Sequence, residues 1–554
     1  MKRTLASLCA ALLVLACAGC SGTNDASSGE AAVTEEVTAT EEATTEETAA
    51  SAEDEASFTP ASATWESTLE SIDMSAWQYD AESDVYWQVG VSYCANPADE
   101  SYETLGVFVP GAYFDATDNG DGTYTCTINA QAEVGGYTAE TAPILFPVNT
   151  PGHKAQDAPT SFERGCTTYT SQGYVYVVAG CRGKDAGVPA GVTDLKAAIC
   201  YIRLSSESLP GDTDRIVVYG MSGGGSQSAV VGATGDSDLY YPYLAELGAA
   251  TTSDAVAAVM SWCPITSYDT SDWSYEWNMG VTRTDLSDEM QAISDGLAEA
   301  YANYVNEMGF VAEDGTLLTL EASDEGIYQA GSYYEYLKGV IEESLEHYLV
   351  DTQFPTSGKS GSYASAEEYV ASLNSDTEWV SYDSATGEVE ITSIAAFAKH
   401  CKAATKPIAA FDKLDQGGHE LFNVGDGEKT HYDSVLHELV KGTSYEAEMA
   451  EDLAKTDALG NDMQYRINMF SPLYYLMEAN DGYGTSSVAA HWRIRTGIEQ
   501  SDTALTTEVN LALALEALGK DVDFETVWGE GHAQAERTGD STENFIAWVN
   551  SLWQ

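Results

Sequence analysis

The stretch "RIVVYGMSGGGSQSAVVGATG", Arg215 to Gly235, joins a buried-strand pattern directly to a cluster of glycines. Residues 216–219 are continuously apolar or aromatic, which is typical of a strand covered on both faces. Residues 220–224 then fit Gly-x-Ser-x-Gly, a sharp strand-to-helix turn that holds its serine in a strained conformation. The small residues that follow predict a helix whose first amides point at the serine. Ser222 is therefore the candidate nucleophile, and the Gly223 N–H is a candidate oxyanion donor.

Apolar runs on both sides of this stretch predict further strands of one sheet. Residues 143–148 and 174–180 are short and continuously apolar. Between the second run and the strand before Ser222, residues 192–209 carry apolar side chains at helical spacing. Strand, helix and strand in this order predict a parallel sheet with right-handed crossovers. Later strand candidates are residues 255–264, 487–497 and 522–529, and antiparallel strands are predicted within residues 86–128.

A long interval separates two of these strand candidates. More than 200 residues lie between Pro264 and Ser487, whereas a crossover connection needs about a dozen. We expect an inserted, mainly helical cap over residues 265–486, with the two parts of the core at residues 58–264 and 487–554. No internal repeat is visible.

The N-terminus predicts export and a lipid anchor. Two basic residues precede an apolar run that is too short to span a bilayer, as in a secretory signal over residues 1–20. Small residues precede both Cys17 and Cys20, so either thiol fits a lipoprotein signal, and Cys20 is the chosen lipidation site. Residues 21–57 are rich in Thr and Glu, with almost nothing large and apolar, which predicts a disordered acidic tether. The expected location is the outer face of the cell membrane, and plain secretion is the alternative.

Composition excludes several classes of function. The chain has 24 basic and 88 acidic residues, a formal net charge of −64. A surface of this sign repels polyanions, so binding to nucleic acid or directly to anionic lipid is not expected. Contact with a membrane is expected only through the lipid anchor. Oligomeric state has no signal in the sequence.

The cysteines do not form a recognisable metal motif. Seven follow Cys20 and none forms a Cys-x-x-Cys pair, so neither a zinc site nor another metal or cofactor is predicted. Cys94 and Cys126 lie in neighbouring strand-like runs and are the favoured disulfide pair. Cys200, on the apolar side of a predicted helix, is expected to be a core residue.

A serine hydroxyl needs a histidine to take its proton and an acid to hold that histidine. Of eight histidines, His532 alone follows the last strand candidate, where the base of such a triad belongs. The acid is expected after the strand at residues 491–497. The usual position falls on Gln500, which cannot carry a charge, so the candidates are Asp502 and Glu499. Asp502 is chosen because Glu499 is out of register and should point away.

In these residues and their order, the chain resembles the bacterial tannase-like, feruloyl-esterase-like serine esterases of the α/β-hydrolase superfamily. The resemblance runs from about Trp87 to the C-terminus. It is carried by "YGMSGGGSQSAVVGATG", "SWCPITSYDTSDWSYEW", "KPIAAFDKLD", "HWRIRTGIEQSDTAL" and "VWGEGHAQAERTG". It implies an α/β-hydrolase fold with a cap, and hydrolysis of galloyl-type esters of phenolic acids by Ser222 and His532.

The resemblance also implies substrate-binding residues. Lys406 and Glu420 match a lysine and a glutamate that bind the phenolic hydroxyls from the cap. The family's triad acid falls on Gln500 and its ring-binding aspartate on Asp502. Either Asp502 has taken over the acid role or catalysis is weakened. With Asp502 as the acid, Gln500 is predicted to be a substrate-binding residue.

The second oxyanion donor is expected in the loop "NTPGHK". The family uses this loop, and the amides of Asn149, Thr150 and Gly152 are all candidates, with Thr150 as the chosen one.

The expected function is thus that of a surface-tethered serine carboxylesterase acting on small phenolic esters, without metal or cofactor. One alternative is a serine peptidase of the prolyl-oligopeptidase type, which normally carries a propeller built from repeats. Another is a ligand-binding lipoprotein on an impaired hydrolase scaffold, which the glutamine at position 500 suggests.

Overall fold

The structure is a computed structural model that describes residues 65–324, 326–358, 361–414 and 420–554. Cys17, Cys20, the signal segment and the tether expected at residues 21–57 lie outside the described residues. Within these ranges, no helix combines the length and apolarity needed to cross a membrane.

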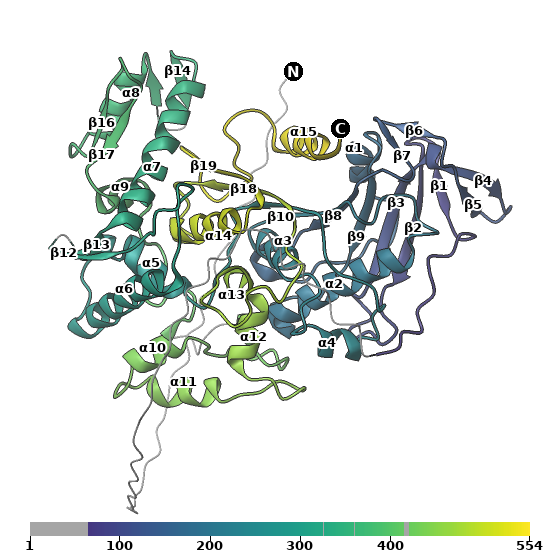
Figure 1. Cartoon of the computed structure of the whole chain (residues 1–554), viewed down its shortest axis with the longest axis horizontal. Helices are drawn as coiled ribbons and strands as arrows, with labels where there is room; N and C mark the ends of the chain where they lie inside the picture. Colours follow the sequence, from purple (N-terminus) through teal and green to yellow (C-terminus); the bar gives the residue numbers. More distant parts are fainter. Residues whose placement is uncertain (1–64, 325, 359–360, 415–419) are drawn as a thin grey trace, which may run out of the picture. The chain divides into compact units, whose positions relative to one another are not determined.

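A nine-stranded sheet forms the centre, in the order β1-β2-β3-β9-β8-β10-β11-β18-β19. Neighbours are parallel from β9 through β19 and antiparallel from β1 through β9. Figure 1 shows the antiparallel and parallel strands as one continuous layer. The strands are β1 (Gln78–Asp80), β2 (Val85–Ser92), β3 (Thr104–Pro110), β8 (Ile144–Val148), β9 (Val175–Ala179), β10 (Ile216–Met221), β11 (Ala258–Trp262), β18 (His491–Gly497) and β19 (Asp521–Val527). The predicted α/β-hydrolase fold, with a mostly parallel sheet, is confirmed.

The central strands are apolar because both of their faces are covered. Val217, Val218 and Met260 are fully buried, as expected of parallel strands between layers of helices. The covering helices include α2 (Val188–Leu204), α3 (Gly223–Ala233), α14 (Leu505–Ala517) and α15 (Ser541–Trp553). Helix α3 packs on β10 and β11, and α14 packs on β18 and β19. These contacts bring the start of α3 and the loops after β18 and β19 to the carboxyl edge of the sheet.

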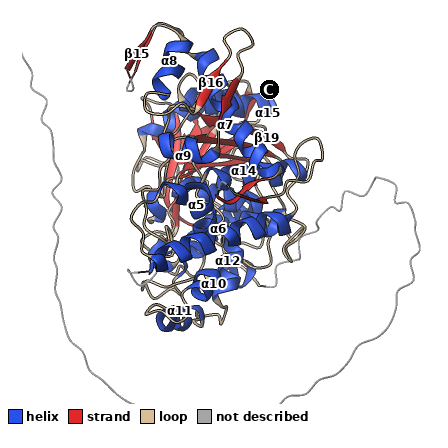
Figure 2. Cartoon of the chain, turned by 90° about the vertical axis from the view of Figure 1, so that its left-hand side faces the viewer, coloured by secondary structure: helices blue, strands red, loops and turns tan. Residues whose placement is uncertain are grey.

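The described residues between β11 and β18 form more helix than strand, with three antiparallel hairpins among them. The helices are α5 (Ser271–Met279), α6 (Asp288–Met308), α7 (Ser332–Asp351), α8 (Ala366–Leu373), α9 (Ile394–Cys401), α10 (Ser434–Leu439), α11 (Glu446–Leu453), α12 (Met463–Phe470) and α13 (Pro472–Leu476), and the hairpins are β12–β13 (Glu321–Ser323, Gly326–Ala330), β14–β15 (Thr356–Gly358, Gly361–Tyr363) and β16–β17 (Val380–Tyr382, Val389–Ile391). The longest helix, α6, begins at the Ser287 cap, whose side chain accepts from Met290 N, and ends at Gly309 with φ 73°. Figure 2 shows these helices in blue beside the red sheet.

The expected disulfide between Cys94 and Cys126 is wrong, because all seven cysteines of the described residues are free thiols. The Cys94 backbone pairs with that of Ala249 in an isolated antiparallel β-bridge, and the Cys94 Sγ lies 3.8 Å from a Glu103 carboxylate oxygen. Cys126 lies instead in the hairpin of β4 (Phe114–Asp118) and β5 (Tyr124–Ile128), where its N–H donates to Met74 O. The two runs are near in sequence but belong to different sheets. Cys200 is buried in α2, as expected.

Candidate active site

Ser222 lies at the turn between β10 and α3, in a backbone conformation that is rare for a residue with a side chain. Its φ of 59° and ψ of −121° store strain that the surrounding contacts must hold. The Ser222 N–H donates to Trp262 O at 2.9 Å, and Ser222 O accepts from the Ser226 N–H and hydroxyl, both at 2.8 Å. The next strand and the first turn of α3 therefore fix the serine backbone on both sides.

The glycines beside Ser222 are required by close backbone approaches. A Cβ on Gly224 would lie 2.0 Å from Val148 O, and one on Gly223 would lie 2.2 Å from Thr150 O. Neither distance is tolerable for a carbon atom in contact with backbone, so any side chain here would push α3 away from β8. The turn is possible only for this residue pattern.

His532 follows β19 and reaches back to the serine. Its Nε2 lies 2.8 Å from Ser222 Oγ. Burial lowers the pKa of His532 below its usual range; Asp502 raises it in part, and Lys406 and Lys402 lower it further. The imidazole is thus neutral near pH 7, as a proton acceptor must be.

The other nitrogen of His532 meets an amide rather than a carboxylate. Gln500 Oε1 lies 3.1 Å from His532 Nδ1, whereas Asp502 Oδ2 lies 3.7 Å from the same nitrogen, outside hydrogen-bond reach. An amide oxygen only accepts, so Nδ1 carries the ring proton and Nε2 is left to accept from the serine. The acid predicted at Asp502 is close enough for an ion pair, but the hydrogen-bond position belongs to Gln500. The backbone N–H of Glu499, the other acid candidate, donates to Glu530 O at 3.1 Å.

The loop after β8 packs against the start of α3, as expected of an oxyanion loop. Thr150 is fully buried, and its hydroxyl donates to Gln227 Oε1 on α3 at 2.7 Å. The Asn149 N–H donates to Gln156 Oε1 at 2.5 Å, so that amide is already engaged. Thr150 and Gly152 remain as candidate donors beside Gly223, whose place next to this loop follows from the close approach to Thr150 O.

Lys406 and Glu420, the predicted substrate-binding residues, have different partners. Lys406 Nζ donates to Asp502 O at 2.6 Å, lies 3.8 Å from Asp502 Oδ1, and lies 4.2 Å from the centre of the Phe411 ring. Burial lowers the pKa of Lys406. Glu420 forms an ion pair with Lys184 at 2.6 Å. The structure thus brings Lys406 and Asp502 together beside His532, and places Glu420 in a separate pair.

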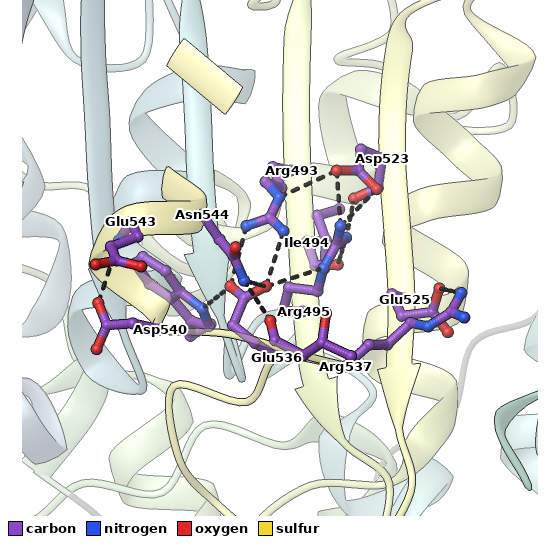
Figure 3. A network of polar contacts seen from close by, with 12 residues as sticks. Arg493, Ile494, Arg495, Asp523, Glu525, Glu536, Arg537, Asp540, Glu543 and Asn544 are labelled. Atoms are coloured by element: carbon purple, nitrogen blue, oxygen red, sulfur yellow. Dashed lines mark hydrogen bonds and ion pairs between the residues drawn. The ribbon is translucent and has the colours of Figure 1, made fainter. Parts of the chain in front are cut away.

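The sequence did not point to Glu536. This residue lies in the loop between β19 and α15 that carries His532, here called the histidine loop, and its carboxylate joins that loop to the sheet. Figure 3 shows its carboxylate between Arg493 and Arg495. Arg493 donates to both carboxylate oxygens at 3.0 and 2.8 Å, and Trp262 Nε1 donates to Oε1 at 3.0 Å. Trp262 is also the residue whose carbonyl holds Ser222. The alternating arginines of "HWRIRTG" in a buried strand were the signal for a carboxylate partner. Glu508 and Lys402, behind Gln500, were missed as well.

No metal site accompanies these residues: within the part of the chain that the structure describes, no group of three or more His, Cys, Asp and Glu side chains could hold an ion.

Known structures share this fold. The native tannin acyl hydrolase of Lactobacillus plantarum is 27% identical, with a TM-score of 0.65 over 85% of this chain and 94% of its own. The Fusobacterium nucleatum tannase is 26% identical, with a TM-score of 0.67 over 85% and 95%. A tannin acyl hydrolase in complex with ethyl gallate is 27% identical, with a TM-score of 0.65 over 85% and 94%.

The sequence comparisons are narrower. The family model BD-FAE matches residues 148–312, which contain the loop after β8 and the turn at Ser222. No curated protein matches the sequence. The predicted resemblance is confirmed, and the fold with these structural likenesses identifies the chain as a tannase-like α/β-hydrolase, a carboxylic-ester hydrolase.

Proposed function

We propose that the chain is a serine carboxylesterase that hydrolyses esters of phenolic acids, of galloyl type, with Ser222 as nucleophile and His532 as base. The observation that carries the proposal is the 2.8 Å contact between His532 Nε2 and Ser222 Oγ at a strained strand-to-helix turn. A neutral imidazole accepts the serine proton as Oγ attacks the ester carbonyl. Gln500 holds the other ring nitrogen during this step.

The remaining steps follow from the same contacts. The tetrahedral oxyanion is stabilised by the Gly223 N–H and an amide of the loop after β8, with Thr150 as the preferred donor. The protonated His532 then gives its proton to the departing alcohol, which leaves the acyl group on Ser222. Water attacks the acyl-enzyme while His532 takes a proton from it. The acid is released and the Ser222 hydroxyl is restored.

The acyl part of the substrate is proposed to be a phenolic acid. Tannin acyl hydrolases of the same fold bind 3,4-dihydroxybenzoate and ethyl gallate in their solved complexes. In this chain Lys406 and the Asp502 carboxylate lie beside His532, so ring hydroxyls would meet a donor and an acceptor there. Glu420, held by Lys184, is proposed as a further contact to the ring hydroxyls.

We also propose that the enzyme works outside the cell, held to the membrane by a lipid on Cys20 and an acidic tether. The support is the sequence alone: an apolar signal-like run, small residues before the cysteine, and the Thr- and Glu-rich segment after it.

Turnover of methyl gallate by the purified chain tests the proposed function. Wild type is expected to hydrolyse methyl gallate with a higher kcat/KM than methyl benzoate, which lacks the ring hydroxyls. Ser222→Ala should lower kcat at least about a thousandfold. Ser551→Ala, a matched change at an exposed residue of α15, should leave kcat unchanged.

Other results would overturn the proposal. Cleavage of peptides without cleavage of esters would indicate the peptidase alternative. Absence of any turnover by folded wild type would indicate a binding protein on a hydrolase scaffold.

A further inference from the structure

Behind Gln500 lies a fully buried carboxylate that the reaction steps above do not use. Glu508 is on α14, and its side chain is inaccessible to solvent. Its Oε1 accepts from Gln500 Nε2 at 2.8 Å, from the Thr503 hydroxyl at 3.0 Å and from the Thr496 hydroxyl at 3.2 Å. A buried carboxylate is costly unless donors surround it. Here three donors converge on Oε1, while Oε2 is buried and has no hydrogen-bond partner among the described residues.

These contacts decide which way the Gln500 amide faces. Its Nε2 donates both to Glu508 Oε1 and to Thr503 Oγ1, the latter at 2.6 Å. The reversed amide would set its oxygen against the Glu508 carboxylate and turn its NH2 toward His532 Nδ1. Two acceptors in contact inside a protein are strongly unfavourable. Glu508 therefore directs Gln500 Oε1 at His532.

A buried lysine holds the backbone of the same residue. Lys402 follows α9, is 1% exposed, and its Nζ donates to the Gln500 carbonyl oxygen. Burial raises the pKa of Glu508 to about 7 and lowers that of Lys402 to about 8, while each charge opposes the shift of the other. Side chain and backbone of Gln500 are thus fixed by a carboxylate and an ammonium from two different elements.

We propose that Glu508 is a positioning residue that supplies, through Gln500, the negative charge which a triad acid would place directly on His532. The inference rests on the proposed function, since it concerns how His532 is held during ester hydrolysis. One amide group separates the Glu508 carboxylate from the imidazole: His532 Nδ1–H donates to Gln500 Oε1, and Gln500 Nε2–H donates to Glu508 Oε1. A charge at the far end polarises such a chain of hydrogen bonds and stabilises the imidazolium.

Several titratable groups face this chain of contacts and will influence its pH dependence. Lys402 lies behind Gln500, and Asp502 and Lys406 lie on the His532 side. The buried Cys263 Sγ lies 3.7 Å from the Thr496 hydroxyl oxygen. The pH profile of a Glu508 variant is therefore compared with the profile of a control variant as well as with that of wild type.

The test is the kinetics of Glu508→Gln on methyl gallate. This change keeps the shape and removes the charge. We expect kcat to fall about ten- to a hundredfold, by analogy with the cost of losing an outer partner of a metal-bound histidine, with KM changed less than about twofold. The drop in kcat should be larger above pH 7 than below it, because the Glu508 carboxyl, whose pKa burial raises to about 7, carries its charge in wild type mainly in that upper range. Glu516→Gln, the same change at the exposed end of α14, should match wild type.

A double variant separates positioning from structural support. Gln500→Asp puts a carboxylate next to His532 and close to Glu508, where two buried like charges disfavour each other. In that background Glu508→Gln should raise kcat, although the same change lowers kcat when Gln500 is present. A merely structural role for Glu508 predicts a loss in both backgrounds.

The outcomes are distinguishable from failure of the proposed function. If wild type does not hydrolyse methyl gallate, the proposed function fails first. If wild type is active and Glu508→Gln matches Glu516→Gln in kcat and pH profile, only the positioning role is overturned. If Glu508→Gln does not fold, Thr503→Val decides: it removes one anchor of the Gln500 amide and should lower kcat at unchanged KM, and an unchanged kcat overturns the role.

Discussion

The turn at Ser222 and the loop at Gln500 meet on the same imidazole, yet they are built in different ways. At the turn, backbone does the positioning: Ser222 N–H bonds Trp262 O, and Gly224 fits against Val148 O. In the loop, side chains do it: Gln500 is held by Glu508 and by Lys402. The first arrangement depends on having no side chain, and the second on having particular ones.

This difference decides how each region tolerates substitution. A backbone turn allows no added atoms, so changes there should displace the nucleophile and the helix together. A side-chain network can change its members while the backbone stays in place, which is how an amide can occupy the position of an acid. The predictions below test this contrast, from the largest expected effect to the smallest.

Gly224→Ala should be the most damaging change at the turn. The new Cβ would lie 2.0 Å from Val148 O, so α3 must shift and Ser222 must move with it. We expect kcat/KM on methyl gallate to fall at least about a thousandfold and stability to fall by about 1–3 kcal/mol. Gly339→Ala on α7, where a Cβ meets open space, is the control and should retain activity. Equal activity in the two variants would show that the turn accepts a side chain.

Glu536→Ala tests the support of the histidine loop. It removes one of the two carboxylates that pair with the nearly buried Arg493 and leaves the half-exposed Asp523 in place, so we expect a loss of at most about 3–5 kcal/mol of stability, the cost of breaking a fully buried ion pair. Because Glu536 also accepts from Trp262, we expect kcat to drop about tenfold at temperatures where the variant is folded. Thermal unfolding followed by circular dichroism checks the first effect. A melting temperature equal to that of wild type would contradict it.

Asp502→Asn should have the smallest effect on rate and a clear effect on pH. Burial holds the pKa of His532 below 6.5, and Asp502 is the group that raises it. The acid limb of kcat/KM should therefore lie below pH 6.5 in wild type and move lower still in the variant, since the imidazole then stays neutral in more acid solution. We expect a loss in kcat of less than about tenfold. A profile that moves to higher pH would reverse the sign of this argument.

The same contrast explains what the sequence could predict. The order of apolar runs and glycines predicted the parallel sheet and the turn at Ser222, because these depend on backbone and burial. The place of His532 after the last strand followed from the order of elements. By contrast, the choice between Asp502 and Gln500 depends on side-chain length and on partners 98 residues away at Lys402. Helix α14 carries two glutamates, Glu508 and Glu516, and no local pattern in the sequence distinguished the buried one from the exposed one.

The most direct test of how His532 is held compares kcat for methyl gallate in Gln500→Leu and in Asp502→Asn. Leucine keeps the volume of Gln500 but cannot accept from His532 Nδ1, so the tautomer is no longer fixed. The structure predicts a loss of about a hundredfold for Gln500→Leu and of less than about tenfold for Asp502→Asn. The opposite order would mean that Asp502 is the acid partner of His532 and would contradict the assignment to Gln500.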